Sequence, residues 1–193
     1  IYGAEPLMAY NRLKDFLRSC REVDIPTSVI TNGLLLNHNK MRELKNCGLD
    51  SITISTDIIP IGSDAKRKKE RAMRLLNECR NFFRDVEVIC TITGKDWELL
   101  PLFIAEMTKK GIWVHFDFYH TNKGQPGSKC SGSRSRMPSE EKIVKVANNL
   151  ISQKKQGYLI HPNLEVLNDL ANNPTLARKQ SWKCIGGGWV TCD

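Results

Sequence analysis

The sequence lacks long hydrophobic runs and closely spaced cysteines. No apolar stretch approaches the ~20 residues that a membrane-spanning helix needs, so we expect no membrane partner. The seven cysteines are an odd number, and none of them forms a CxxC or CxxxC pattern. This argues against a disulfide framework and favours a reducing, cytoplasmic location. Cys20, Cys47 and Cys79 fall on apolar helical stripes and are expected to be buried.

Acidic residues are also under-represented. The 29 Lys and Arg residues outnumber the 21 Asp and Glu residues, which gives a net charge of +8. Much of the excess lies in residues 66–71 (KRKKER) and in Lys154 and Lys155. No aromatic residues are interleaved with the basic run, as a platform for stacking nucleic-acid bases would require. These segments therefore predict solvated helix faces rather than a nucleic-acid site, and they leave an anionic substrate open.

Strand and helix patterns alternate over the first 121 residues. The expected strands are 28–31, 51–55, 86–93 and 112–119. The expected helices are 13–23, one that Asn37 begins and Gly48 ends, one that carries residues 72–82, and one from Asp96 to Gly111. This order of strand and then helix predicts an α/β fold with parallel strands joined by right-handed crossovers.

Two of these strands have one polar face. Residues 51, 53, 55 and 57 oppose Ile52 and Ile54, and residues 113, 115, 117 and 119 oppose another apolar set. A small closed barrel fills its lumen with branched apolar side chains. A polar inner face therefore predicts either a ligand-filled lumen or a dense internal hydrogen-bond network, and it favours a partly open barrel.

Small and polar residues follow the strands where parallel α/β folds bind ligands. They are Gly3-Ala4-Glu5-Pro6, Thr31-Asn32-Gly33 and Ser55-Thr56-Asp57. In the first segment, the carboxylate and the backbone carbonyls suit an ammonium group, and the small residues allow close approach of a ligand. Hydroxyl and amide side chains in the other two suit a ribose diol. The alternative is ordinary turn chemistry, with a salt-bridged glutamate in the first segment.

This series resembles the radical S-adenosylmethionine (SAM) enzymes, whose SAM-binding loop typically reads GGEPL where this chain reads GAEPL. The resemblance implies a partial (β/α) TIM-like barrel over residues 1–121, truncated at both ends, whose first strand and cluster loop lie upstream of Ile1. Ala4 and Ile58 depart from glycines of the family pattern. The resemblance implies SAM-binding roles for Gly3, Ala4, Glu5, Pro6, Asn32, Ser55, Asp57, Thr93 and Tyr119.

The resemblance also implies the cofactors and the chemistry. SAM would be cleaved reductively at a [4Fe–4S] cluster to give a 5′-deoxyadenosyl radical, which abstracts hydrogen from a substrate. The cluster-binding CxxxCxxC motif would lie upstream, so this fragment alone is expected to be inactive, and an electron donor such as a flavodoxin or ferredoxin is implied. No catalytic residue is assigned. His115 and Asp117 are candidates for handling substrate or protons, and hydrogen-bonded structure is the alternative; His161 is expected at the surface.

The chain changes character after residue 121. Residues 122–181 predict a linker and two helices, one beginning near Pro138 and one over 163–171. Residues 182–193 resemble the start of a SPASM or twitch extension, in which Cys184 would be a ligand of an auxiliary iron–sulfur cluster. A coincidental cysteine in a glycine-rich tail is the alternative. The extension would imply peptide or protein maturation, with small-molecule substrates left open.

Two other functions compete with this interpretation. A phosphate-handling (β/α) barrel without iron is disfavoured, because no glycine-rich phosphate loop follows any expected strand. A degenerate barrel that binds SAM, RNA or a protein partner without radical catalysis stays open. Binding that collapses with salt, without affinity for SAM, would favour the RNA or protein partner.

Overall fold

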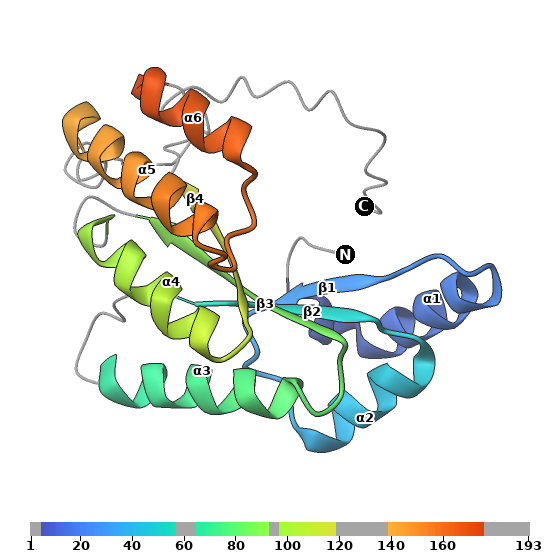
Figure 1. Ribbon diagram of the computed structural model, residues 1–193. Helices are drawn as coiled ribbons and strands as arrows, with labels where there is room; N and C mark the ends of the chain where they lie inside the picture. Colours follow the sequence, from blue (N-terminus) through green and yellow to red (C-terminus); the bar gives the residue numbers. More distant parts are fainter. Residues whose placement is uncertain (1–4, 57–64, 93–96, 119–138, 176–193) are drawn as a thin grey trace, which may run out of the picture. The chain divides into compact units, whose positions relative to one another are not determined.

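The computed structural model describes residues 5–56, 65–92, 97–118 and 139–175. The described residues form two compact units, one up to Ile89 and one from Cys90 onward (Figure 1). The described residues from Cys90 to Phe118 belong to the second unit together with the helices that follow. The predicted functional boundaries at 121 and 181 stay predictions.

The sheet has four strands in the order β1-β2-β3-β4. They are β1 (Ser28–Thr31), β2 (Ser51–Ser55), β3 (Asp85–Ile92) and β4 (Trp113–Phe118). β1 pairs with β2 in parallel, and so does β2 with β3. The α/β class and these parallel neighbours are confirmed, and β3 begins one residue earlier than predicted. Since parallel strands end at the same edge, the residues after β1 and β2 lie side by side.

In the first unit, the helices begin and end where local signals place them. They are the 3₁₀ turn η1 (Pro6–Ala9), α1 (Tyr10–Glu22), α2 (His38–Cys47) and α3 (Ala65–Cys79). The Asn37 side chain accepts a hydrogen bond from the Lys40 amide, as an N-cap does. Gly48 ends α2 at a φ of 107°, a left-handed conformation that favours glycine. Both predicted ends of α2 are therefore confirmed.

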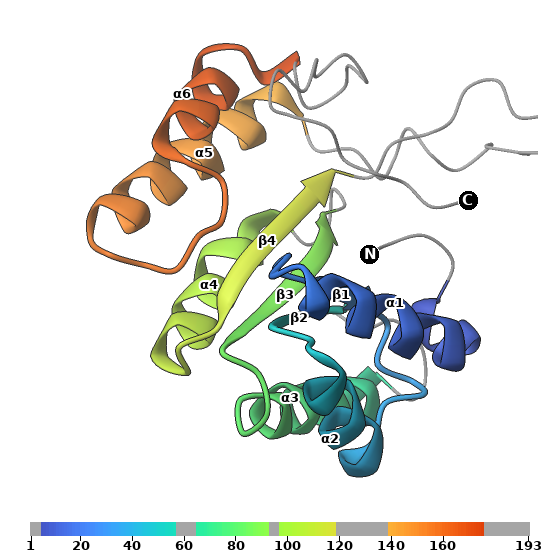
Figure 2. The same ribbon diagram turned by 90° about the vertical axis from the view of Figure 1, so that its right-hand side faces the viewer.

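In the second unit, the helices are η2 (Trp97–Leu99), α4 (Leu100–Lys109), α5 (Glu140–Lys155) and α6 (Leu164–Asn172). The helix predicted to begin at Asp96 starts with the 3₁₀ turn η2, and its α-helical part α4 begins at Leu100 after Leu99; Asp96 itself lies outside the described residues, so its capping stays a prediction. Ser139 and Asn163 cap α5 and α6 through their side chains. α5 and α6 pack against each other, as both views show (Figure 1 and Figure 2).

The cores of both units contain the predicted apolar residues. Cys20, Cys47 and Cys79 are buried, as expected, and so is Cys90. Trp97 is fully buried, and its indole N–H donates to the Lys142 carbonyl at 2.5 Å. None of the helices in the described ranges is long and apolar enough to span a membrane.

Part of the polar face of the strands forms hydrogen bonds within the protein. Thr53 is 3% exposed, and its hydroxyl donates to Glu87 Oε2 at 3.3 Å across the neighbouring strand. At this position the hydrogen-bond alternative holds, and Glu87 belongs to the polar face without having been predicted there. In β4, Val114 is fully buried while Trp113 is 38% exposed, so the predicted alternation is confirmed for these residues.

Candidate functional site

Glu5 lies at the candidate SAM-binding segment and links it to the end of β1. It caps η1, with Pro6 in the first position of that turn. One carboxylate oxygen, Oε1, accepts from the Leu7 amide at 3.2 Å and from the Thr31 hydroxyl at 2.6 Å. The other oxygen, Oε2, accepts from the Asn32 amide at 2.9 Å. One side chain therefore fixes both the loop that enters η1 and the turn that leaves the strand.

Thr31 continues this arrangement into the strand-end turn. Its side chain is almost fully buried, at 2% residue exposure. The hydroxyl donates to Glu5 and accepts from the Gly33 amide at 3.0 Å. We call Glu5, Thr31, Asn32 and Gly33 the Glu5 network. The Glu5 carboxylate accepts hydrogen bonds from three protein donors. Glu5 therefore contributes to a ligand site here by holding the backbone in place rather than by binding the ligand directly.

The turn after β1 is also held from α3. Gly33 has a φ of 69°, and a Cβ atom there would overlap Leu75 Cδ2, so both conformation and space require glycine. Arg71 donates to the Leu34 carbonyl at 2.9 Å and to the Gly33 carbonyl at 3.4 Å. The prediction of a purely solvated basic face is therefore incomplete for Arg71, which also holds the site turn.

Asn32 and Ser55 end neighbouring strands. Thr31 pairs with Ile54 in the parallel register, so the residues that follow them lie at the same edge of the sheet. The side chains of Asn32 and Ser55 are exposed there. Asn32 Oδ1 accepts from the Leu34 amide at 2.8 Å, which is the turn chemistry that the sequence analysis kept as an alternative. Its side-chain NH₂ group has two N–H donors, which suit a ligand with acceptor oxygens.

Several predicted site residues lie outside the described residues. They are Gly3, Ala4, Asp57, Thr93, Tyr119 and Cys184. Asp117 belongs to β4, but its side chain is also outside the description. The roles assigned to these residues stay predictions.

His115 lies in the second unit and has a partner that the sequence did not reveal. Its ring stacks on that of His161, with centroids 4.9 Å apart and planes inclined by 7°. His161 is exposed, as predicted, and its amide donates to the Val114 carbonyl at 2.9 Å. Val114 and Ile160 form a parallel bridge, which brings the segment after α5 beside β4. Sequence reasoning missed this pairing because an isolated bridge has no periodic pattern.

The described residues do not fit an iron–sulfur cluster. Among them, no group of three or more His, Cys, Asp or Glu residues could hold a metal ion. Their four cysteines are buried, and burial raises the pKa of the Cys79 thiol to about 12. Cluster ligands are thiolates, and the burial of Cys79 disfavours its thiolate form. Any cluster ligands must be sought elsewhere in the protein.

Comparison with known proteins shows solved structures with a similar fold but low sequence identity to this chain. No protein-family model matches the chain. A segment of 54 residues is 41% identical to an uncharacterized protein of Methanocaldococcus jannaschii, covering 28% of this chain and 18% of that protein. Solved structures of anSMEcpe, a radical SAM enzyme, are similar at 16% identity.

The structural similarity extends over most of this chain. The structure of anSMEcpe with bound AdoMet (SAM) has a TM-score of 0.59 and that with bound AdoMet and the Cp18Cys peptide 0.58; each covers 93% of this chain. The chain spans about half of anSMEcpe, 52% and 53% in the two structures. At this identity the similarity concerns the fold. The α/β fold of the chain is therefore similar to the fold of the matched part of anSMEcpe.

Proposed function

We propose that the chain binds SAM at the edge where β1 and β2 end, with the Glu5 network as the scaffold of the site. The observation that carries this proposal is the set of three hydrogen bonds from Leu7, Thr31 and Asn32 to the Glu5 carboxylate. These bonds hold residues 5–7 against the neighbouring strand end. Similarity to a fold that binds AdoMet in anSMEcpe supports the identity of the ligand.

In this proposal, some groups contact SAM and others hold the contacting segments in place. The segment of residues 3–6 supplies backbone carbonyls for the ammonium group of SAM, and Glu5 holds that segment in place. Asn32 and Ser55 supply exposed polar side chains for hydroxyl or carboxylate groups of the ligand. Arg71 and Gly33 act indirectly, because they fix the turn that carries Asn32. The family resemblance also implies SAM-binding roles for Pro6, Asp57, Thr93 and Tyr119, and these roles stay part of the proposal.

For the whole protein we propose a radical SAM enzyme built on a partial (β/α) barrel. A [4Fe–4S] cluster would supply the electron that cleaves SAM to a 5′-deoxyadenosyl radical, which takes a hydrogen atom from the substrate. The cluster ligands, the electron donor and an auxiliary cluster at Cys184 belong to this proposal and involve residues outside the description. A peptide substrate is supported by the peptide-bound structure of anSMEcpe. His115 and Asp117 are proposed to face the substrate.

A second candidate is a barrel that binds SAM, RNA or a protein without radical catalysis. The described residues contain no group that could hold a metal ion, and this candidate requires none. Expression of the reading frame including the region upstream of Ile1, with anaerobic reconstitution, separates the two. Formation of 5′-deoxyadenosine from SAM supports the radical enzyme, whereas SAM binding without this product supports the second candidate.

Equilibrium dialysis with radiolabelled SAM tests the binding site on the 193-residue chain. The double variant Asn32→Ala/Ser55→Ala removes two polar side chains at the site. The control Ser19→Ala/Asn81→Ala makes the same changes at exposed positions away from it. Two lost hydrogen bonds predict binding about tenfold weaker, and the control should match the native chain. The proposal fails if SAM does not bind saturably or if both variants bind equally well.

A further inference from the structure

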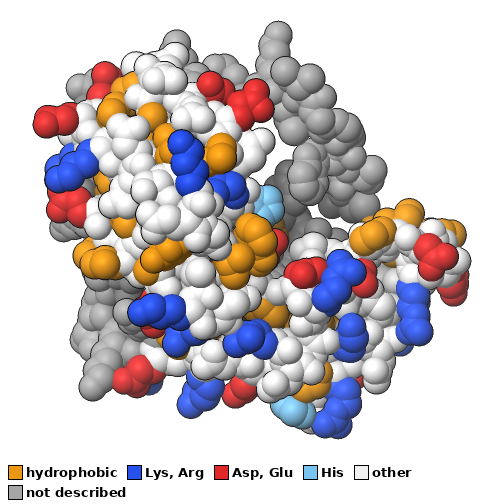
Figure 3. Space-filling model, in the orientation of Figure 1, with side chains coloured by type: hydrophobic (Ala, Val, Ile, Leu, Met, Phe, Trp, Pro, Cys, Tyr) orange, Lys and Arg blue, Asp and Glu red, His pale blue; other side chains and the backbone are white. Residues whose placement is uncertain are grey.

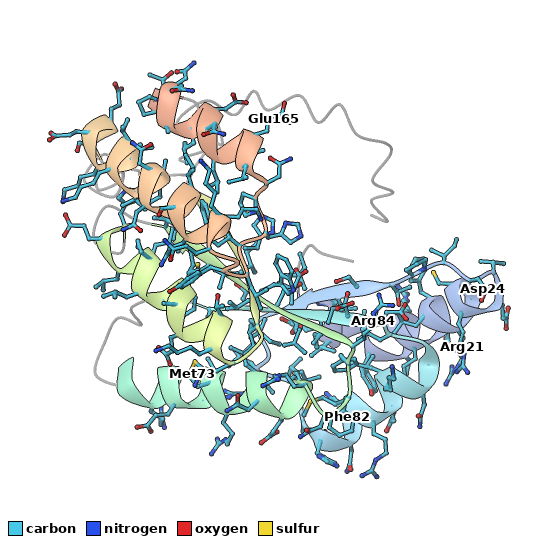
Figure 4. All side chains as sticks on the ribbon, in the orientation of Figure 1. Arg21, Asp24, Met73, Phe82, Arg84 and Glu165 are labelled. Carbon is cyan, nitrogen blue, oxygen red and sulfur yellow. The ribbon has the colours of Figure 1, made fainter. Side chains whose placement is uncertain are left out.

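The first unit has a hollow of about 650 Å³ at the other edge of the sheet, where the strands begin. It is lined by the ends of α1 and α2 and by the residues that lead into β1, β2 and β3. Figure 4 labels three of its residues, Arg21 and Asp24 from the end of α1 and Arg84 from the start of β3. The remaining lining residues are Ile25, Pro26, Lys45, Asn46, Gly48, Leu49 and Asp50.

The walls of the hollow are fixed by close packing and backbone hydrogen bonds. A Cβ atom on Gly48 would come within 2.9 Å of Arg21 Cβ, so the ends of α1 and α2 meet at this glycine. Arg21 donates to the Asn46 carbonyl at 2.8 Å. The Thr27 amide donates to Asp50 Oδ2 at 2.9 Å, and the Arg84 amide donates to the Asp50 carbonyl at 3.2 Å. The shape is therefore set before any ligand binds.

The charges of the hollow are largely unpaired with one another. Three cations, Arg21, Lys45 and Arg84, line it from three different elements. Among the described residues, no ion pair joins one of these cations to Asp24 or Asp50, and Arg84 instead pairs with Asp85 at 2.8 Å. Asp50 is engaged by the Thr27 amide. Arg21 and Arg84 each keep further N–H donors beside their bonds to Asn46 and Asp85, Lys45 adds an ammonium group, and Asp24 adds a carboxylate.

An apolar rim borders these charges. Val23 is 64% exposed and Ile25 is 55% exposed, both in the segment between α1 and β1. Figure 3 shows hydrophobic side chains at the surface over this segment, with Lys and Arg side chains over the adjoining parts of α1 and α2. Large apolar side chains beside a charged hollow are typical of a protein interaction site, where apolar anchors are combined with a polar rim.

We propose that this hollow docks an acidic peptide segment of a partner protein. Glutamate or aspartate side chains of the segment pair with Arg21, Lys45 and Arg84, and an apolar side chain rests on Val23 and Ile25. A peptide also has backbone N–H donors, which suit Asp24. An RNA segment matches the lining less well, because its phosphates would face Asp24 and Asp50 and no aromatic side chain lines the hollow for base stacking.

This site is separate from the proposed SAM site. The hollow lies where the strands of the first unit begin, and the Glu5 network lies where β1 ends. A partner in the hollow therefore leaves the Glu5 network accessible. The inference does not depend on the proposed SAM binding, and variants of the hollow are expected to bind SAM like the native chain.

Fluorescence anisotropy with a labelled synthetic peptide of glutamate and leucine tests the proposal on the 193-residue chain at low salt. The variant Lys45→Gln/Arg84→Gln removes two cations of the hollow. The control Lys109→Gln/Lys155→Gln removes two exposed lysines of the second unit, with the same change in net charge. We expect saturable binding that weakens with salt, a loss of about fivefold or more in the hollow variant, and little change in the control.

Three results would overturn the proposal. The first is that the acidic peptide does not bind, or binds no better than a peptide with glutamine in place of glutamate. The second is an equal loss in both double variants, which would indicate attraction by the net charge alone. The third is that inorganic phosphate or a short single-stranded RNA binds in the hollow while the peptide does not. Matching thermal melts of the variants exclude unfolding as the cause.

Discussion

The Glu5→Gln substitution tests the central feature of the site. It keeps the size of the side chain, removes its charge and replaces one acceptor oxygen by an NH₂ group. In the native chain both oxygens accept: Oε1 from Leu7 and Thr31, and Oε2 from Asn32. A glutamine has one acceptor oxygen, so an NH₂ donor must face at least one of these donors. The remaining hydrogen bonds also lose their charge assistance.

The expected magnitude follows from the number and the exposure of these bonds. A hydrogen bond to a charged group contributes about 1.5–3 kcal/mol. The network is only partly buried, so water can reach the displaced Asn32 amide, and the lower end applies. We therefore expect the free energy of unfolding to fall by about 2 kcal/mol, which corresponds to a decrease in Tm of about 4–8 °C for a chain of this size.

Urea and thermal denaturation followed by circular dichroism measure this change. Glu98→Gln is the matched control, because Glu98 is exposed and pairs only with Lys142 at 2.9 Å among the ion pairs recorded in the described ranges. An exposed pair contributes about 0–1 kcal/mol. Hydrogen exchange of the Asn32 amide gives a local readout, and its protection should fall in Glu5→Gln. If Glu5→Gln were as stable as Glu98→Gln and kept this protection, the Glu5 network would not hold the turn.

Three further predictions concern single residues. Gly33→Ala should destabilise the chain by about 1–3 kcal/mol in urea denaturation, because its Cβ overlaps Leu75 at a positive φ; unchanged stability would contradict the packing of this turn. The hydrogen bond from Lys14 lowers the pKa of Glu43, so the native state binds fewer protons than the unfolded state, and stability should be lost as the pH falls below 4.5 through the native pKa. In an acid titration, the free energy of unfolding of Glu43→Gln should fall less steeply with decreasing pH than that of the native chain. An equal slope in the two proteins would contradict this. Cys79 should resist iodoacetamide at pH 8 in the native chain and react in urea, because burial raises the pKa of its thiol to about 12; rapid native labelling in mass spectrometry would contradict its burial.

Local sequence signals determined most of the fold. Asn37 and Gly48 set the ends of α2 because capping depends on one side chain and one backbone conformation, both of which are local. The strand 51–55 was predicted with its observed bounds because its alternation is regular, and the strand 28–31 because Pro26 ends the helix before it. The start of α4 was mispredicted at Asp96, since a 3₁₀ turn and an α-helical turn share the same apolar spacing over a few residues.

The candidate site was located by the sequence and explained only by the tertiary structure. Glu5 and Asn32 were singled out because small and polar residues after strands are a local pattern. That the Glu5 carboxylate binds Thr31 and Asn32 depends on bringing together segments 26 and 27 residues apart, which no local pattern encodes. The same holds for Arg71, which looks like part of a solvated basic run and nevertheless binds the carbonyls of the site turn.

The hollow at the opposite edge also depends partly on the sequence alone and partly on the tertiary structure. The sequence determined the net charge of +8 and its bias toward lysine and arginine. It did not place Arg21, Lys45 and Arg84 around one hollow, because they are distant in the chain and meet only when α1, α2 and β3 pack together. Periodicity and capping act over a few residues, so they determine elements and their ends. Sites form where elements meet, and the packing of the whole unit decides which side chains share them.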